Sequence, residues 1–438
     1  MTSFKEGLLL NGVIPLSDIV YHTGLSSWYH HIGDMLTWNP ERIKEWQFAR
    51  MKELIRDAYI YSPYYHGLFE SISLKPDDVR TSDDLKIIPP LTKEIIRDHY
   101  DEILLRGKKG LHYRHCSTGG STGNPTRYIK DNDSWGFDNA FNIHMWKQTG
   151  YHYGDKFLAL GSSSIFPTSK RSLIHDVYYS LKGKIPFNAM NMSDDVLCNC
   201  VKLITRHHIH YIYGYASSIY LLAKYVEKNC LSDSLQIKAC FPTSEILTDL
   251  YRTTIENAFK CTVSNMYGAH DGGIVAHCID HEFKVGYNCI VQTCEDSSSS
   301  ALLTDVLSHS FPFIRYKLGD EVVLGTGYND FYNGQVLEKV IGRTSDIIRL
   351  ENGHTLTGPG FTILFSKLNI KGYRVYKSNT LEITVVVVKT PEYSERDDRL
   401  IIETMKKHAG EDCNIIIEYA DSLEVRKNGK NYFFLNKV

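Results

Sequence analysis

The sequence predicts an α/β protein with a large layered α/β N-terminal domain and a small α+β C-terminal domain. First, its 438 residues exceed what one hydrophobic core usually organises, so more than one domain is expected. Second, the central region alternates short apolar runs with amphipathic helical stretches, which is the pattern of βα units. Third, the residues after 349 carry several strand-like runs and one helix-like stretch, which is typical of a small α+β domain.

The elements of the large domain can be placed in order along the chain. A helix is expected after Asn39, which can cap it, because Pro40 suits the first turn and apolar residues then recur near helical spacing. Strands are expected in three central runs that are each followed by helix-like sequence: residues 156–163, 209–217 and 235–244.

The C-terminal region has a different pattern. Its strand-like runs are residues 373–377, 381–389 and 414–420, and a helix is expected over residues 394–407. We place a hinge at residues 343–346, between a large domain of residues 1–342 and a small mobile domain of residues 347–438.

Composition excludes some classes of partner. Lys+Arg 49 against Asp+Glu 51 leaves a formal charge of −2, which argues against nucleic acid or an anionic membrane recognised through a basic field. No run approaches the roughly 20 apolar residues of a membrane span, and no signal-peptide core is present. The ten cysteines are therefore expected as thiols or metal ligands in the cytoplasm. The sequence does not decide between a monomer and a homodimer.

A glycine-rich loop is the most informative local feature. Glycines let backbone amides approach a phosphate closely, and hydroxyl groups add donors to its oxygens. The loop is not a Walker A motif, because the GK[ST] ending is missing. The same composition also fits a Ser/Gly-rich surface turn. The loop residues are Thr118, Gly119, Gly120, Ser121, Thr122 and Gly123.

The segment STGGSTGNPTRY, residues 117–128, resembles the signature loop of the acyl-adenylate-forming superfamily, in the version carried by phenylacetate–CoA ligases and their capsular-polysaccharide-biosynthesis relatives. Residues 89–100, PPLTKEIIRDHY, resemble the segment that precedes the loop in that family. Four more blocks follow in the family's order, so the resemblance extends from about residue 40 to the C-terminus. It implies ATP and Mg²⁺ as cofactors.

Two blocks resemble the nucleotide-binding core of the family: FPTSEIL at residues 241–247 and VSNMYGAHDGG at residues 263–273. Taken alone, an aromatic–Gly turn after a strand is common, and an Asp often only caps a helix. The resemblance implies that Asp271 helps to hold Mg²⁺, as a hard oxygen ligand suits that ion. It also implies a set of adenine-binding residues: Thr243, Ser244, Glu245, Tyr267 and Gly268.

Three more residues take roles by resemblance. In YKLGDEV, Asp320 corresponds to the Asp that hydrogen-bonds the ribose, although Gly-Asp alone is a turn signal. In IGRTSDIIRL, Arg343 is the candidate contact to ribose or phosphate, but Ser345 stands where the family has the first of two Asp. In RKNGKNYFFLNKV, Lys430 corresponds to the catalytic lysine, against the alternative of a solvated basic tail.

The acid pocket is expected between two loops that follow predicted strands. Their aromatic and small residues fit a compact acid without identifying it. The candidate substrate-binding residues are Ser162, Tyr213, Gly214 and Tyr215.

A cluster of Cys and His residues offers a zinc alternative. Cys278, His281 and Cys289 lie close in the sequence and are types that bind Zn²⁺, although their spacing matches no standard finger. Free Cys is equally a normal buried residue. A nucleophile at Cys116 beside His115 is rejected, because no orienting partner can be assigned.

The resemblance implies a two-step reaction. A carboxylic acid and Mg·ATP would give acyl-AMP and pyrophosphate, and the acyl group would then pass to CoA, or to an amine such as an amino sugar in surface-polysaccharide biosynthesis. The alternative is a non-catalytic nucleotide- or acyl-binding protein, which the departures from the family at Asn124, Asp271 and Ser345 motivate.

Overall fold

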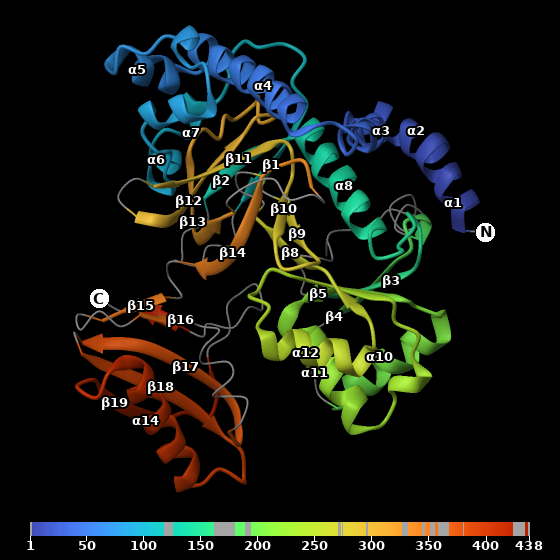
Figure 1. Cartoon of the computed structure of the whole chain (residues 1–438), viewed down its shortest axis with the longest axis vertical. Coiled ribbons are helices and arrows are strands. Elements are labelled where there is room, and N and C mark those ends of the chain that lie inside the picture. Colours follow the sequence, from blue (N-terminus) through green and yellow to red (C-terminus); the bar gives the residue numbers. More distant parts are fainter. Residues whose placement is uncertain are drawn as a thin grey trace.

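The structure is a computed structural model. It describes residues 2–117, 126–161, 180–188, 194–269, 273, 275–294, 297–325, 332–343, 347–350, 355–357, 368–379, 381–423 and 434–436. Figure 1 shows a large domain and, below it, the small C-terminal domain.

Helices precede, cover and connect the strands of the large domain. The predicted helix after Asn39 is confirmed as α4, because the Asn39 side chain accepts a hydrogen bond from Arg42 N at 2.9 Å and Pro40 occupies the first turn. The helices are α1 (Thr2–Leu8), η1 (Leu9–Val13), α2 (Ile14–Tyr21), α3 (Leu25–Met35), α4 (Pro40–Tyr61), α5 (Pro63–Ser71), η2 (Pro76–Asp78), η3 (Ser82–Ile87), α6 (Lys93–Asp98), α7 (Tyr100–Ile103), α8 (Asn132–Lys147), α10 (Asp194–His207), α11 (Ala216–Lys228), η4 (Ser232–Ser234), α12 (Asp249–Phe259) and α14 (Glu395–Ala409).

The strands confirm the three central runs and the three C-terminal runs. They are β1 (Tyr113–Ser117), β2 (Arg127–Asp131), β3 (Phe157–Gly161), β4 (Lys184–Asn188), β5 (Tyr211–Tyr215), β6 (Ala239–Thr243), β7 (Thr262–Val263), β8 (Asn265–Gly268), β9 (Val275–Cys278), β10 (Phe283–Val285), β11 (Cys289–Cys294), β12 (Ser297–Asp305), β13 (Tyr316–Leu324), β14 (Val336–Arg343), β15 (Ile347–Arg349), β16 (Thr355–Thr357), β17 (Ile370–Asn379), β18 (Glu382–Lys389), β19 (Asn414–Tyr419) and β20 (Phe434–Asn436).

One long sheet forms the centre of the large domain. Its order is β11-β12-β13-β14-β10-β9-β8-β6-β5-β3-β4, with β7 beside β6. The half from β8 to β4 is parallel, as the βα pattern predicts, and α10, α11 and α12 pack on it. The half from β11 to β9 is antiparallel. The sequence pattern did not indicate this second half.

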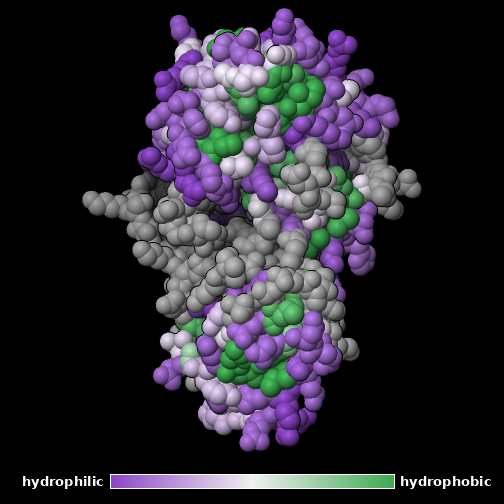
Figure 2. Space-filling model, turned by 90° about the vertical axis from the view of Figure 1, so that its left-hand side faces the viewer, coloured by the Kyte–Doolittle hydropathy of each residue, from purple (hydrophilic) through white to green (hydrophobic). Residues whose placement is uncertain are grey.

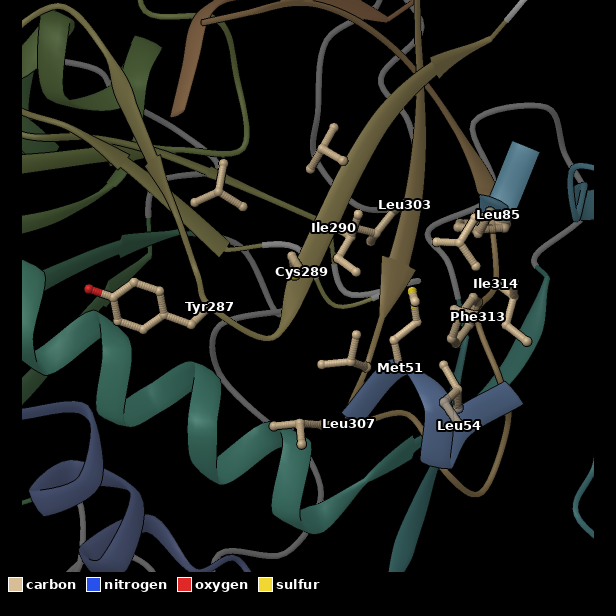
Figure 3. Packing of buried hydrophobic residues seen from close by; sticks show 14 of the residues in the cluster. Met51, Leu54, Leu85, Tyr287, Cys289, Ile290, Leu303, Leu307, Phe313 and Ile314 are labelled. Atoms are coloured by element: carbon tan, nitrogen blue, oxygen red, sulfur yellow. The ribbon is translucent and has the colours of Figure 1, made fainter. Parts of the chain in front are cut away.

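The largest hydrophobic cluster lies under the antiparallel half. There α4 contributes Met51 and Leu54 to the same cluster as Cys289 and Ile290 of β11 and Leu303 of β12, and Leu54 lies beside Phe313 and Ile314 (Figure 3). These buried side chains fix the helices of residues 40–103 to the sheet.

In its described residues, the small domain has a four-stranded sheet, the two-stranded sheet β15–β16 and the helix α14. The order of the four-stranded sheet is β19-β18-β17-β20, and α14 begins at a capping box in which the Ser394 and Asp397 side chains bond each other's backbone N–H groups. Ile348 and Leu350 belong to the core of this domain, so the chain has entered it by residue 348. Figure 2 shows the face on the left of Figure 1, where hydrophobic surface occurs on both domains among hydrophilic residues.

Candidate active site

The carboxyl ends of three parallel strands bring the predicted nucleotide residues together. β5 ends at Tyr215, β6 at Thr243 and β8 at Gly268. Tyr215 is the register partner of Thr243, and Thr243 is the partner of Met266. Ligands of open α/β sheets bind outside the carboxyl ends of the strands, so this edge is the candidate site.

The segment after β6 is held to the neighbouring helix. Thr243 is buried, and Ser244 is exposed with a left-handed φ of 66°. Glu245 Oε2 accepts a hydrogen bond from Ser217 N at 2.8 Å, in the first turn of α11. A carboxylate is stabilised at a helix N-terminus, so Glu245 joins the predicted adenine segment to the predicted acid-binding turn.

Tyr267 and Asp320 form a side-chain pair across this edge. The Tyr267 hydroxyl donates to Asp320 Oδ2 at 2.8 Å, and Asp320 is buried, with 8% of its surface exposed. β8 and β13 are not neighbours in the sheet, so this hydrogen bond is a long-range link between two blocks that were separate in the sequence. It places the predicted ribose ligand beside the predicted adenine partner.

The C-terminal end of β14 lies beside Asp320 and the loop after β6. Asp320 is the register partner of Arg343 in the β13–β14 ladder. Gly342 has a φ of 126°, and a Cβ on it would lie 2.5 Å from Ile246 Cδ1. Gly342 therefore lets β14 pass directly against the loop after β6. The Arg343 side chain lies outside what the structure describes.

The residues predicted to bind the acid, Tyr213, Gly214 and Tyr215, are packed against neighbouring elements. Tyr213 packs 5.7 Å, ring to ring, from Trp146, and burial raises the pKa of Tyr213 to about 12. A Cβ on Gly214 would overlap Leu160 O of β3, so only glycine allows this strand spacing. Tyr215 is also buried. These contacts fix β5 within the sheet, and an acid-binding role for the three residues stays a prediction.

Several predicted site residues lie outside the described residues. They are the loop residues Thr118–Gly123, then Ser162, Asp271, Lys430 and the hinge residues 344–346.

A buried ion-pair network lies between the exit of the glycine loop and the turn after β8. Lys130 Nζ on β2 lies 2.9 Å from Asp138 Oδ2 and 3.5 Å from Asp305 Oδ2, and Ser134 Oγ donates to Asp305 Oδ2 at 2.9 Å. Burial opposes the charge of Lys130, but the two carboxylates outweigh it and raise its pKa. Burial raises the pKa of Asp138 to about 6, against the attraction of Lys130.

Gly273 packs against this ion-pair network, where a larger residue would not fit. Its φ is 78°, and a Cβ on it would overlap Lys130 Nζ and lie 2.7 Å from Asp305 Oδ2. Cys289 Sγ also donates to Gly273 O at 3.6 Å. Gly273 therefore packs directly against the ion pairs. Sequence reasoning missed the network, because its members are up to 175 residues apart, and only the charge of Lys130 in an apolar strand hinted at it.

Comparisons with known proteins agree with these blocks. Residues 359–437 match the family described as CapK C-terminal domain. The chain is 23% identical over 406 residues to Protein CapK of Staphylococcus aureus, covering 90% of this chain and 89% of that protein. It is 30% identical over 98 residues, 22% of each chain, to the phenylacetate-coenzyme A ligase of Aromatoleum evansii. A 2-hydroxyisobutyryl-CoA ligase in complex with R3-HIB-AMP aligns with a TM-score of 0.67 at 13% identity, over 90% of this chain and 89% of that one.

These similarities support the resemblance to the phenylacetate–CoA ligase-like family of acyl-adenylate-forming enzymes, and to its capsular-polysaccharide-biosynthesis branch. The structural likeness shows the shared fold, a large α/β domain with a sheet like this one and a C-terminal domain.

The described residues fit the ribose and adenine of a nucleotide of the kind that adenylate-forming enzymes use. Asp320 is a buried carboxylate that can accept hydrogen bonds from hydroxyl groups, and Tyr267 offers an aromatic face beside it. The predicted Mg²⁺ ligand Asp271 lies outside the described part of the chain, so its role stays a prediction.

The zinc interpretation is not supported. Within the described ranges, no group of three or more His, Cys, Asp or Glu residues is arranged to hold a metal ion. Cys278 lies on β9 and Cys289 on β11, which are not neighbouring strands, and His281 lies in the turn after β9. Burial raises the pKa of both thiols, which opposes the thiolate form.

The helices that the structure describes differ from membrane-spanning helices in length or composition. None of them is both long and apolar enough to cross a bilayer.

Proposed function

We propose that this chain is an ATP-dependent ligase that activates a carboxylic acid as its acyl-AMP. The observation that carries the proposal is the Tyr267–Asp320 pair beside Thr243 and Glu245, at the carboxyl edge of the sheet. These residues come from separate blocks that resemble the family's nucleotide site, and they lie together in space. Relatives and structural neighbours named as CoA ligases support the same reaction class.

The first step forms one bond and breaks another at phosphorus. A carboxylate oxygen of the acid attacks the α-phosphorus of ATP, and pyrophosphate leaves with the electrons of the broken P–O bond. Asp320 holds the ribose through its hydroxyl groups, and Tyr267 orients Asp320 while its ring covers the adenine. Arg343 and Lys430 supply positive charge, and Lys430 meets the negative charge that builds up at the reacting oxygens. Mg²⁺, held by Asp271, would neutralise phosphate charge.

The second step transfers the acyl group. A thiol or amine attacks the acyl carbon, and AMP leaves. We propose that the small domain, residues 347–438, turns about residues 343–346 between the steps and removes Lys430 from the site. Support comes from a 2-hydroxyisobutyryl-CoA ligase, which has solved structures in a postadenylation state and in a thioesterification state. This chain aligns with them at TM-scores of 0.67 and 0.57.

The acceptor is either CoA or an amine. The relatives named as phenylacetate-coenzyme A ligases, which are 30% and 31% identical over 98 residues, support CoA. The alternative of an amine on a sugar, in surface-polysaccharide biosynthesis, rests on the resemblance of the sequence blocks to the capsular-polysaccharide-biosynthesis branch, and the near full-length likeness to Protein CapK supports that branch. The turn of residues 213–215 would adjoin the acid in either case.

The test is pyrophosphate release across a library of carboxylic acids. An active acid is expected to release pyrophosphate only with ATP present, and mass spectrometry with CoA or candidate amines then identifies the acceptor. If no acid gives release while ATP binds equally to the wild type and to Lys430→Ala, the chain is a nucleotide-binding protein without ligase activity.

A further inference from the structure

The first helices form one continuous segment fixed to the large domain. α1, η1 and α2 follow one another without a break from residue 2 to residue 21, and the residues at the junctions keep right-handed helical dihedrals. One side of the segment is anchored, because Glu6 Oε1 lies 3.1 Å from Lys147 Nζ and Leu9, Leu10 and Ile14 are buried in a cluster beside α8. The segment is therefore part of the folded domain and not a loose tail.

The opposite side of this segment is apolar and exposed. Of the eleven large hydrophobic residues that are exposed in the described part of the chain, six lie between residues 4 and 21. Phe4 is 80% exposed and Ile19 is 71% exposed. We call these six residues the apolar stripe: Phe4, Leu8, Leu16, Ile19, Val20 and Tyr21.

The spacing of the stripe places five of its six residues along one face, while Tyr21, seven residues after the buried Ile14, lies at its end. Residues four apart lie on the same side of a helix, as in the pairs Phe4–Leu8 and Leu16–Val20. The wide π-helical turn η1 lies between the two pairs. At 1.5 Å per residue, the face from residue 4 to residue 20 is roughly 24 Å long.

The exposed apolar area of the stripe is at the upper end of what a monomer usually exposes to water. With ~150 Å² for each fully exposed side chain, the lower end of the range for aromatic residues, the exposed fractions sum to on the order of 600 Å². The largest apolar patch of a typical monomer is about 300–600 Å². A standard protein–protein interface buries about 800 Å² on each partner, which the stripe and its polar border can supply.

Charge indicates the kind of partner. Among residues 2–38, Lys5 is the only Lys or Arg. Helices that bind anionic membrane surfaces carry clusters of basic residues, and this segment has none. An uncharged apolar face is complementary to a copy of itself, as in two-fold homodimers, whose interfaces are richer in apolar surface. We propose that the apolar stripe is the interface of a homodimer of this chain.

The position of the stripe is compatible with catalysis in each copy. Figure 1 shows α1, α2 and α3 on the opposite side of the molecule from the small domain with β17, β18 and β19. Pairing through the stripe therefore leaves both small domains free of the contact. The proposal does not depend on the proposed reaction, because it rests on the exposed helices alone.

The test measures mass in solution. Size exclusion with light scattering, over a dilution series, is expected to give the wild type twice the monomer mass. The double variant Leu16→Glu, Ile19→Glu is expected to run as a monomer with an unchanged Tm. The matched control carries two glutamates at hydrophobic positions far from the stripe that are 56% and 53% exposed, Ile60→Glu and Ile87→Glu, and is expected to stay dimeric.

Three results would overturn the proposal. A wild type that is monomeric at the highest concentration leaves no dimer to explain. A stripe variant that remains dimeric moves the interface elsewhere. Binding of a monomeric wild type to phosphatidylcholine or phosphatidylserine vesicles, lost in the stripe variant, assigns the surface to lipid. If the glutamates lower the Tm, the milder Ile19→Ser is used, and it is expected to weaken dimerisation at unchanged Tm.

Discussion

The variant Tyr267→Phe separates two roles of one side chain. It keeps the ring that we expect against adenine and removes only the hydroxyl, which donates to Asp320 Oδ2 at 2.8 Å. A hydrogen bond to a charged group contributes about 1.5–3 kcal/mol. We take the lower end of this energy range for the Tyr267–Asp320 hydrogen bond, because Tyr267 is only partly buried. Our account is that this hydrogen bond holds Asp320 in place for the ribose; since about 1.4 kcal/mol is a factor of ten in affinity, ATP should then bind up to about tenfold more weakly.

The assay is calorimetric titration with ATP, together with thermal unfolding. The matched control is Tyr65→Phe, because the Tyr65 hydroxyl also makes a buried hydrogen bond, to Pro312 O at 3.0 Å, in the core away from the strand edge. The control should lose stability and keep ATP affinity. If Tyr267→Phe also keeps wild-type ATP affinity and loses only stability, the Tyr267–Asp320 pair is structural and the assigned nucleotide site is wrong.

Three further predictions test the network, the pH response and the lysine. Lys130→Met leaves buried carboxylates without their cation, so urea denaturation should show a loss of about 3–5 kcal/mol. The exposed pair Lys228–Asp194 is the control, and Lys228→Met should change stability by only about 0–1 kcal/mol. Burial lowers the pKa of His277 to about 3, from 6.5 in the unfolded chain. The unfolded state therefore binds more protons below pH 6.5, stability falls as the pH drops through that window, and His277→Gln should flatten this slope in denaturation at pH 4 to 7. Lys430→Ala should nearly abolish pyrophosphate release and keep transfer from preformed acyl-AMP, and equal loss of both half-reactions contradicts its role.

Short sequence patterns correctly predicted the helices and strands that depend on capping residues and apolar runs within a few residues of each other. The cap at Asn39 and the apolar runs of β3, β5 and β6 lie within short windows of sequence, and the structure confirms them. The ordered motif series predicted which blocks would meet. The Tyr267–Asp320 hydrogen bond joins two of these blocks.

The sequence could not predict contacts between residues that are far apart along the chain. The three-way contact of Lys130 with Asp138 and Asp305 needs the fold, because a charged residue in an apolar strand does not identify its counter-ion. Alternation along β5 indicates that Tyr211 and Tyr213 share a face, but not that this face packs on the cluster around Trp146. The zinc alternative is unsupported for a related reason, because Cys278 and Cys289 are close in sequence but lie on strands that are not neighbours.

The most direct test of the central claim follows an oxygen atom. The acid identified by pyrophosphate release is prepared with a heavy oxygen isotope in its carboxylate, and the nucleotide product is analysed by mass spectrometry after acyl transfer. Attack of the carboxylate on the α-phosphorus predicts AMP that carries one heavy oxygen atom from the acid. Unlabelled AMP, or ADP as the nucleotide product, would contradict an acyl-AMP intermediate.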